Sequence, residues 1–201
     1  MVSGVGYRRT IRDRIAQEAA RFMIEGGISD FKKAKRKALD RLRIKRTTSI
    51  PSNEEVETAK LQYHRIFLAD IQPNWLSHMR NVAINAMQLT DVFEPRLVGS
   101  VLSGTADEHS RITLHLCCDP TEMFGVFLTG HNIRHRLSQR KLRLGRERFG
   151  MFPTYEFVLQ GIPVDVLVFD FPAVKQCPLS PVDGRPMPRA NRKQVTELLK
   201  T

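Results

Sequence analysis

The spacing of apolar residues in this chain changes near residue 92, and this change most constrains the fold. Before that point, as in residues 11–23, apolar residues recur every three or four positions, which predicts amphipathic helices. After it, short apolar runs lie between turn residues, which predicts strands. We therefore predict an α+β protein, with a helical N-terminal region over residues 1–91 and an α+β domain over residues 92–201.

The predicted helices carry recognisable start and stop signals. Gly26–Gly27 ends the first helix, and Asp30 can cap the second. Ser52 and Glu55 have the spacing of a capping box, which predicts the start of a third helix. Pro73 is expected to break or kink the pattern before a further helix.

The second half of the chain alternates predicted strands with turns. Residues 96–102 and 111–118 are predicted as two strands joined by a polar turn, and residues 155–159 and 162–169 as a hairpin. Proline following Asp119 predicts a helix over residues 120–130.

The C-terminal end of the chain differs from both halves. Residues 177–189 contain four prolines and one glycine, which predicts an irregular arm that packs over a sheet edge. Asn191 can cap a short terminal helix after this arm.

Residues 97–114 combine a strand, a Gly-Ser pair, a glycine-containing connection and a second strand. The pair is Gly99–Ser100, and Arg111 and Thr113 stand at alternate positions at the start of the second strand. This order resembles the signature of the nucleotidyltransferase superfamily, in which Gly-Ser contacts phosphate and two aspartates at alternate strand positions hold magnesium. The resemblance implies a mixed sheet with flanking helices over residues 92–201.

The resemblance places Arg111 and Thr113 at the first two metal positions and Asp165 at the third. A guanidinium is always protonated and repels a metal ion, and threonine offers only a neutral oxygen. One carboxylate is too few for two magnesium ions. We therefore interpret the chain as a catalytically degenerate nucleotidyltransferase-like protein, a pseudoenzyme that binds no metal.

Four residues are candidates for binding a nucleotide or nucleic-acid phosphate: Gly99, Ser100, Arg111 and Thr113. Arginine recognises phosphate through paired hydrogen bonds, and glycine lets phosphate approach the backbone. The alternative for Arg111 is a solvent-facing side chain at a strand start. An ion pair between Arg111 and Asp165 would neutralise the pocket and weaken the phosphate-binding interpretation.

The net charge of +11 indicates a polyanionic partner. We predict nucleic-acid backbone contacts, with RNA favoured over DNA, by the cations Lys32, Lys33, Lys35, Arg36, Lys37, Arg41 and Arg43. A second cluster, in a strand or a loop, comprises Arg134, Arg136, Arg140, Lys141, Arg143, Arg146 and Arg148. The alternative is a solvated surface, or pairing with acids such as Glu54, Glu55 and Glu57.

Two other functions stay open at this point. The first is an active magnesium-dependent transferase, acting on RNA, protein or a small molecule, with Asp165 as a catalytic ligand and Glu108 as a further acid. The second is a protein-interaction module that docks through the N-terminal helices. Magnesium is the expected cofactor only in the first case.

Composition bounds the remaining possibilities. Three cysteines make a poor disulfide framework, which favours a reducing cytoplasm of bacterial type. No apolar run has the length of a membrane span, so we expect no membrane partner. A zinc site is disfavoured because the candidate ligands lack paired Cys-x-x-Cys spacing; they are His115, Cys117, Cys118, His131 and His135.

Overall fold

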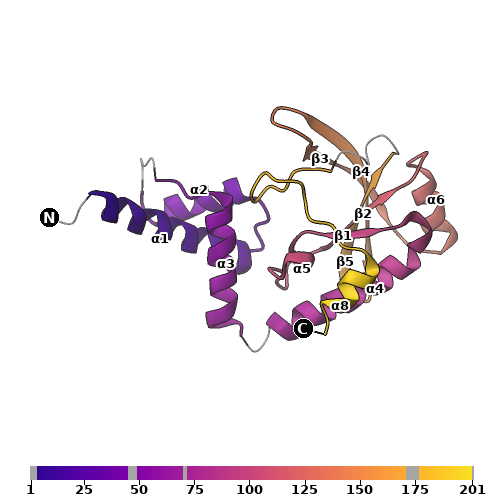
Figure 1. Cartoon of the computed structure of the whole chain (residues 1–201), viewed down its shortest axis with the longest axis horizontal. Coiled ribbons are helices and arrows are strands. Elements are labelled where there is room, and N and C mark those ends of the chain that lie inside the picture. The colour runs from indigo at the N-terminus through magenta and orange to yellow at the C-terminus, as the bar shows by residue number, and fades with distance from the viewer. Residues whose placement is uncertain (1–3, 45–48, 70–71, 171–176, 201) are drawn as a thin grey trace. The chain divides into compact units, whose positions relative to one another are not determined.

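The computed structural model describes residues 4–44, 49–69, 72–170 and 177–200 (Figure 1). The chain divides into two compact units, each with a buried core of its own. The helical unit comprises residues 1–72, 107–109 and 181–183, and the sheet unit comprises residues 73–106, 110–180 and 184–201. The protein is α+β, with a helical N-terminal region and a five-stranded mixed sheet with flanking helices.

The helical unit contains α1 (Gly4–Ile24), α2 (Phe31–Arg41) and α3 (Asn53–Phe67). The predicted start signals are confirmed. Oδ1 of Asp30 accepts a hydrogen bond from the Lys33 amide at 2.6 Å. Ser52 and Glu55 form the complete capping box.

Small residues dominate the helix contacts of this unit. Ala19 of α1, Ala34 and Ala38 of α2 and Val56 of α3 are buried in one apolar cluster. Because these side chains are short, the helix backbones can approach closely, and the burial of their apolar sides stabilises helices that would be marginal alone.

The elements of the sheet unit are, in chain order, α4 (Gln72–Leu89), η1 (Asp91–Phe93), β1 (Arg96–Val98), α5 (Ser100–Ser103), β2 (Ile112–Cys117), α6 (Met123–Gly130), β3 (Arg136–Arg143), β4 (Phe149–Leu159), β5 (Ile162–Phe169) and α8 (Arg192–Glu197). The strand order is β1-β2-β5-β4-β3. Only the central β2–β5 pair is parallel, and the other neighbours are antiparallel.

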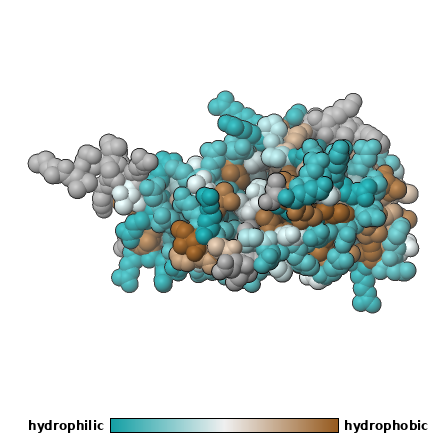
Figure 2. All heavy atoms as spheres, turned by 60° about the horizontal axis from the view of Figure 1, so that its bottom comes forward, coloured by the Kyte–Doolittle hydropathy of each residue, from teal (hydrophilic) through white to brown (hydrophobic). Residues whose placement is uncertain are grey.

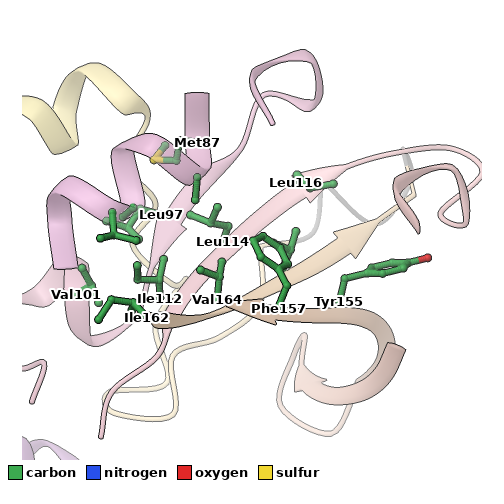
Figure 3. Packing of buried hydrophobic residues seen from close by; sticks show 14 of the residues in the cluster. Met87, Leu97, Val101, Ile112, Leu114, Leu116, Tyr155, Phe157, Ile162 and Val164 are labelled. Carbon is green, nitrogen blue, oxygen red and sulfur yellow. The ribbon is translucent and has the colours of Figure 1, made fainter. Parts of the chain in front are cut away.

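The core of the sheet unit lies between one face of the sheet and the helices α4 and α6. Figure 3 labels core side chains from α4, α5 and four of the strands, including Met87, Leu114 and Val164. Because α4 contributes Met79, Val82 and Met87 to this core, it belongs to the sheet unit, although its sequence position is within residues 1–91. The boundary between the units therefore lies near residue 72, since packing and not helical periodicity defines it.

The structure differs from the sequence predictions at several helix and strand ends, and β4 begins at Phe149, six residues before the predicted start. The strand predicted over residues 96–102 ends at Val98, where Gly99 (φ +75°) turns the chain into the short helix α5. The helix predicted from Pro120 begins at Met123, because the Pro120 carbonyl closes a turn with the Met123 amide instead. The break predicted at Pro73 is confirmed, since α3 ends at Phe67 and α4 begins at Gln72. Pro73 lies in the first turn of α4, where its missing N–H costs no helical hydrogen bond.

The arm over residues 177–189 is irregular, and the bonds at its two ends reach both edge strands. The Leu179 amide donates to the Arg143 carbonyl of β3 at 2.7 Å. At the other end, Ala190 pairs with Leu97 of β1 through hydrogen bonds of 2.8 and 3.0 Å. These bonds satisfy backbone groups that an uncovered sheet edge would leave open.

Candidate functional site

One row of polar side chains crosses the sheet on the face away from the α4–α6 core. Thr113 of β2 lies opposite Asp165 of β5, Asp165 lies opposite Glu156 of β4, and Glu156 lies opposite Arg136 of β3. Because cross-strand partners point to the same side, the four side chains share one face. Asp165 is therefore central to a polar row built by four strands.

The Asp165 carboxylate is fully engaged by two arginines. Nε of Arg111 donates to its Oδ1 at 2.7 Å, Nη2 of Arg111 lies 2.6 Å from the same oxygen, and Nη2 of Arg140 donates to its Oδ2 at 2.5 Å. Asp165 is 1% exposed, whereas the Arg111 and Arg140 side chains are 42% and 41% exposed. The hydrogen bond with Asp165 raises the pKa of Arg111 above its ordinary value, although burial opposes this effect. We call Asp165, Arg111 and Arg140 the arginine–aspartate cluster.

Glu156 extends the cluster toward the sheet edge. Its Oε2 lies 3.8 Å from Nη2 of Arg111 and 3.9 Å from Nε of Arg136, and its Oε1 accepts a 2.6 Å hydrogen bond from Ser138. Three arginines thus surround two carboxylates on this face. The face keeps a surplus of positive charge even after every ion pair is counted.

The residues of this cluster do not fit a magnesium ion. Magnesium needs several oxygen ligands in an octahedral arrangement, but both oxygens of Asp165 already accept from guanidinium groups. A cation placed there would also meet the charges of Arg111 and Arg140 at close range. Within the described ranges, no group of three or more His, Cys, Asp or Glu side chains has metal-binding geometry.

The structure brings together Arg111, Thr113 and Asp165, three of the candidate residues singled out from the sequence. The sequence analysis included Arg140 only as a member of the second cationic cluster, and it did not name Glu156. In the structure both side chains lie on the face of the polar row, one on β3 and the other on β4. The sequence signal for this role was a charged residue at every second position of a strand. That pattern is common on solvated strands, so it does not single out a functional residue.

Gly99 and Ser100 follow β1 directly, beside the start of the polar row, because Val98 pairs with Thr113. Gly99 has a positive φ, which residues other than glycine rarely adopt. Apart from Gly99 itself and its two chain neighbours, no atom of the described residues lies within 4 Å of the position that a Cβ of Gly99 would occupy, so the backbone is open on that side.

The second cationic cluster, for which the sequence allowed a strand or a loop, lies on the β3–β4 hairpin. Residues 134–148 contain seven Lys and Arg residues and one Glu. Among the described residues, no acid is found paired with five exposed members of this cluster: Arg134, Lys141, Arg143, Arg146 and Arg148. Nζ of Lys141 lies 4.6 Å from the ring centre of Phe149, which is 52% exposed. The hairpin therefore presents cations beside an aromatic ring.

The first cationic cluster lies on α2 of the helical unit, where several members have local partners. Lys35 donates to the Pro51 carbonyl and to Asn53, Lys37 lies over the Phe22 ring, and Arg41 lies 3.9 Å from Glu18. The other exposed members are Lys32, Lys33, Arg36 and Arg43. Glu55, an acid considered as their partner, pairs with Arg12 of α1 instead.

The candidate zinc ligands each have another environment. His115 is buried beside the Phe169 ring, and burial raises the pKa of both Cys117 and Cys118. Nδ1 of His131 and Nδ1 of His135 lie at hydrogen-bond distance from the carbonyls of their own turns.

Comparison with known proteins adds no relative. The chain matches no protein-family model, no curated protein and no solved structure.

Among the described residues, no helix has both the length and the apolar composition that crossing a membrane requires. Hydrophilic residues predominate on the face shown in Figure 2, with hydrophobic residues in smaller patches.

Proposed function

We propose that this protein binds the phosphates of a nucleotide or nucleic acid, with RNA favoured over DNA, and that it does so without a metal ion and without nucleotidyl transfer. The exposed cations of the β3–β4 hairpin carry the proposal of phosphate binding. The engagement of Asp165 by Arg111 and Arg140 supports only its metal-free part, and it weakens phosphate binding at Arg111 itself. In a metal-dependent nucleotidyltransferase, the carboxylate at the position of Asp165 has to coordinate the metal ion. Here its charge is balanced by arginines, and the surrounding face is cationic.

The β3–β4 hairpin supplies the contact surface in this proposal. Each Lys or Arg that approaches a phosphate releases condensed counterions, which favours binding at low salt. Lys141 lies over the exposed ring of Phe149 and Arg143 is its cross-strand partner, and an unpaired base can stack on that ring. Both features suit a single-stranded or looped RNA better than a continuous duplex.

Arg111 has a different role from the phosphate contact that its chemistry predicted in the sequence. Because Nε of Arg111 donates to Oδ1 of Asp165 and Nη2 lies 2.6 Å from the same oxygen, the paired edge that would hold phosphate is already occupied. We therefore assign Arg111 to holding Asp165. Gly99, Ser100 and Thr113 stay candidates for a phosphate beside the open backbone at the end of β1.

The test measures the affinity for a fluorescent single-stranded RNA at several salt concentrations, with magnesium and with a chelator. We expect binding in both cases, weakening as salt rises. The double variant Arg146→Gln/Arg148→Gln should reduce the slope of log K against log salt by about 1.4, since each RNA phosphate that is no longer neutralised lowers it by about 0.7. The matched control, Lys193→Gln/Lys200→Gln, removes two charges elsewhere in the same unit and should leave the slope unchanged. A strict magnesium requirement would contradict the proposal.

Two results would favour the other functions. A labelled nucleotide transferred to RNA, protein or a small acceptor, and lost in Asp165→Ala, would establish an active transferase. No affinity for nucleotide or nucleic acid at low salt would favour a protein-interaction module.

A further inference from the structure

Arg189 lies at the end of the arm, directly before the residue that pairs with β1. Ala190 is held by two backbone hydrogen bonds to Leu97 and is buried in the α4–α6 core. Neighbouring residues of an extended segment point to opposite sides, so Arg189 points to the face of the polar row. Its guanidinium accordingly lies over the ring of Phe169, 5.8 Å from the ring centre.

The guanidinium of Arg189 has one buried edge with unused donors. Its Nε and Nη2 are both inaccessible to solvent, and neither has a hydrogen-bond partner within the described part of the chain. These two nitrogens form the edge through which arginine holds an oxyanion with two parallel hydrogen bonds. The planar face of the Arg189 guanidinium has a cation–π contact with the Phe169 ring. That contact provides no acceptor for the N–H groups on this edge.

His115 is a second buried group without a partner, on the same sheet face. It lies two residues after Thr113 on β2, is 2% exposed, and its ring centre lies 4.9 Å from that of Phe169. Its Nδ1 has no hydrogen-bond partner within the described residues. Burial, reinforced by the charges of Arg189 and Arg140, lowers the pKa of His115 to about 3, so the ring is neutral at pH 7 and can donate from one nitrogen.

Buried donors without partners are rare in native proteins, and where they occur together an ion or a ligand often binds to them. An anion would satisfy Nε and Nη2 of Arg189 and Nδ1 of His115 together. A planar carboxylate that pairs with the arginine edge has both oxygens in the plane of the guanidinium, and it has no third oxygen to offer a donor on another side. A tetrahedral phosphate offers two oxygens to that edge and a third to the histidine.

We propose that Arg189 and His115 form a subsite for a phosphate monoester dianion, with Arg189 as its main contact. The same chemistry occurs in inorganic phosphate and in the terminal phosphate of a 5′-phosphorylated RNA. Recognition of an RNA end rests on the proposed function, whereas binding of inorganic phosphate does not. The subsite would give a general phosphate-binding surface a preference for phosphorylated ends.

The first test uses the unmodified protein and follows the Arg189 Nε–H signal by NMR. Titration with inorganic phosphate should shift this signal, while chloride at the same ionic strength should not. An unchanged signal at saturating phosphate would overturn the proposal, and this readout does not depend on any variant folding.

The second test compares two RNA hexamers of one sequence, with a 5′-phosphate and with a 5′-hydroxyl. We expect the phosphorylated RNA to bind about tenfold more tightly, as charge-assisted hydrogen bonds allow. Arg189→Gln should reduce that ratio to about one, and Arg189→Lys should remove most of it because lysine lacks the paired edge. The matched control Lys193→Gln also removes one charge and should keep the full ratio.

The outcomes separate this proposal from the proposed function. If neither RNA binds, the proposed function fails, and the inorganic phosphate titration still decides the subsite. If both RNAs bind equally well to the wild-type protein, or if a folded Arg189→Gln variant keeps the tenfold ratio, the subsite is disproved while the proposed function stands.

Discussion

Arg111 and Asp165 are joined by a 2.7 Å hydrogen bond from Nε and a 2.6 Å ion-pair contact of Nη2, both to Oδ1, although 54 residues separate them in the chain. The parallel pairing of β2 with β5 brings them together, because it aligns Thr113 with Asp165. Arg111 lies two residues before Thr113 in the chain and reaches the same carboxylate. An arginine thus occupies the position beside the central carboxylate that a metal ion would need.

Asp165→Asn should destabilise the protein and strengthen its binding of RNA. The amide cannot balance the charges of Arg111 and Arg140, and we expect a loss of about 2 kcal/mol in the free energy of unfolding. The loss should stay below that of a fully buried pair, because both arginines are about two-fifths exposed. The two released guanidinium groups should raise RNA affinity at low salt.

Urea unfolding and fluorescence anisotropy measure these two effects. Glu94→Gln, which removes an exposed acid in the same unit, is the control and should change stability little. Weaker RNA binding by a folded Asp165→Asn protein would show that the carboxylate itself contacts the ligand.

His115 should stay neutral throughout the physiological pH range. Burial is the main cause of its lowered pKa, and Arg189 and Arg140 add to it. Since the folded pKa of about 3 lies below the unfolded value of about 6.5, the stability that the neutral ring contributes is lost as pH falls below about 6.5. One such group gives a slope of at most about 1.4 kcal/mol per pH unit.

NMR of the His115 ring protons between pH 7 and pH 4 tests this directly, and the signals should not move. In His115→Gln, the part of the stability loss below pH 6.5 that comes from this ring should disappear. A titration midpoint of His115 above pH 5 would contradict the prediction that burial and the nearby arginines keep the ring neutral.

Glu55 should make the helical unit sensitive to acid. Burial raises the pKa of Glu55, but the hydrogen bonds from Arg12 and from the Ser52 amide outweigh it and hold the pKa below its ordinary value. The stability from this carboxylate is therefore present above the unfolded pKa of about 4.3 and is lost as pH falls through the folded pKa.

Circular dichroism of α-helix content, recorded against urea at a series of pH values, checks this. Glu55→Gln should show a shallower loss of stability below about pH 4.5, since glutamine keeps the capping box without the charge. Glu54→Gln, an exposed neighbour, should retain the wild-type dependence. Equal pH profiles for all three proteins would show that the capping box contributes through geometry alone.

Leu114→Ala should destabilise the sheet unit by about 3 kcal/mol, because it leaves a cavity in the α4–α6 core. Leu114 is fully buried at the centre of β2 (Figure 3). Val158→Ala on β4 is the matched control, since Val158 is largely exposed and should lose less than about 1 kcal/mol. Urea unfolding followed by the amide signals of β2 would distinguish the two.

Sequence patterns predicted the elements whose signals are local. The capping box at Ser52, the Asp30 cap and the hairpin turn at Gln160–Gly161 were all found as expected, because each depends on residues close together in the chain. The end of β1 was not predicted, since Val101 is apolar enough to continue a strand and instead fills the core from α5.

The sequence by itself determined the α+β class, the helix caps and the excess of positive charge in residues 134–148, because periodicity, capping and charge are properties of neighbouring residues. Only the tertiary structure decided that α4 belongs to the sheet core, that Arg140 joins Arg111 on Asp165, and that Arg189 and His115 meet at Phe169. These relationships depend on strand register and on the path of the arm, which long-range packing fixes and no local pattern encodes.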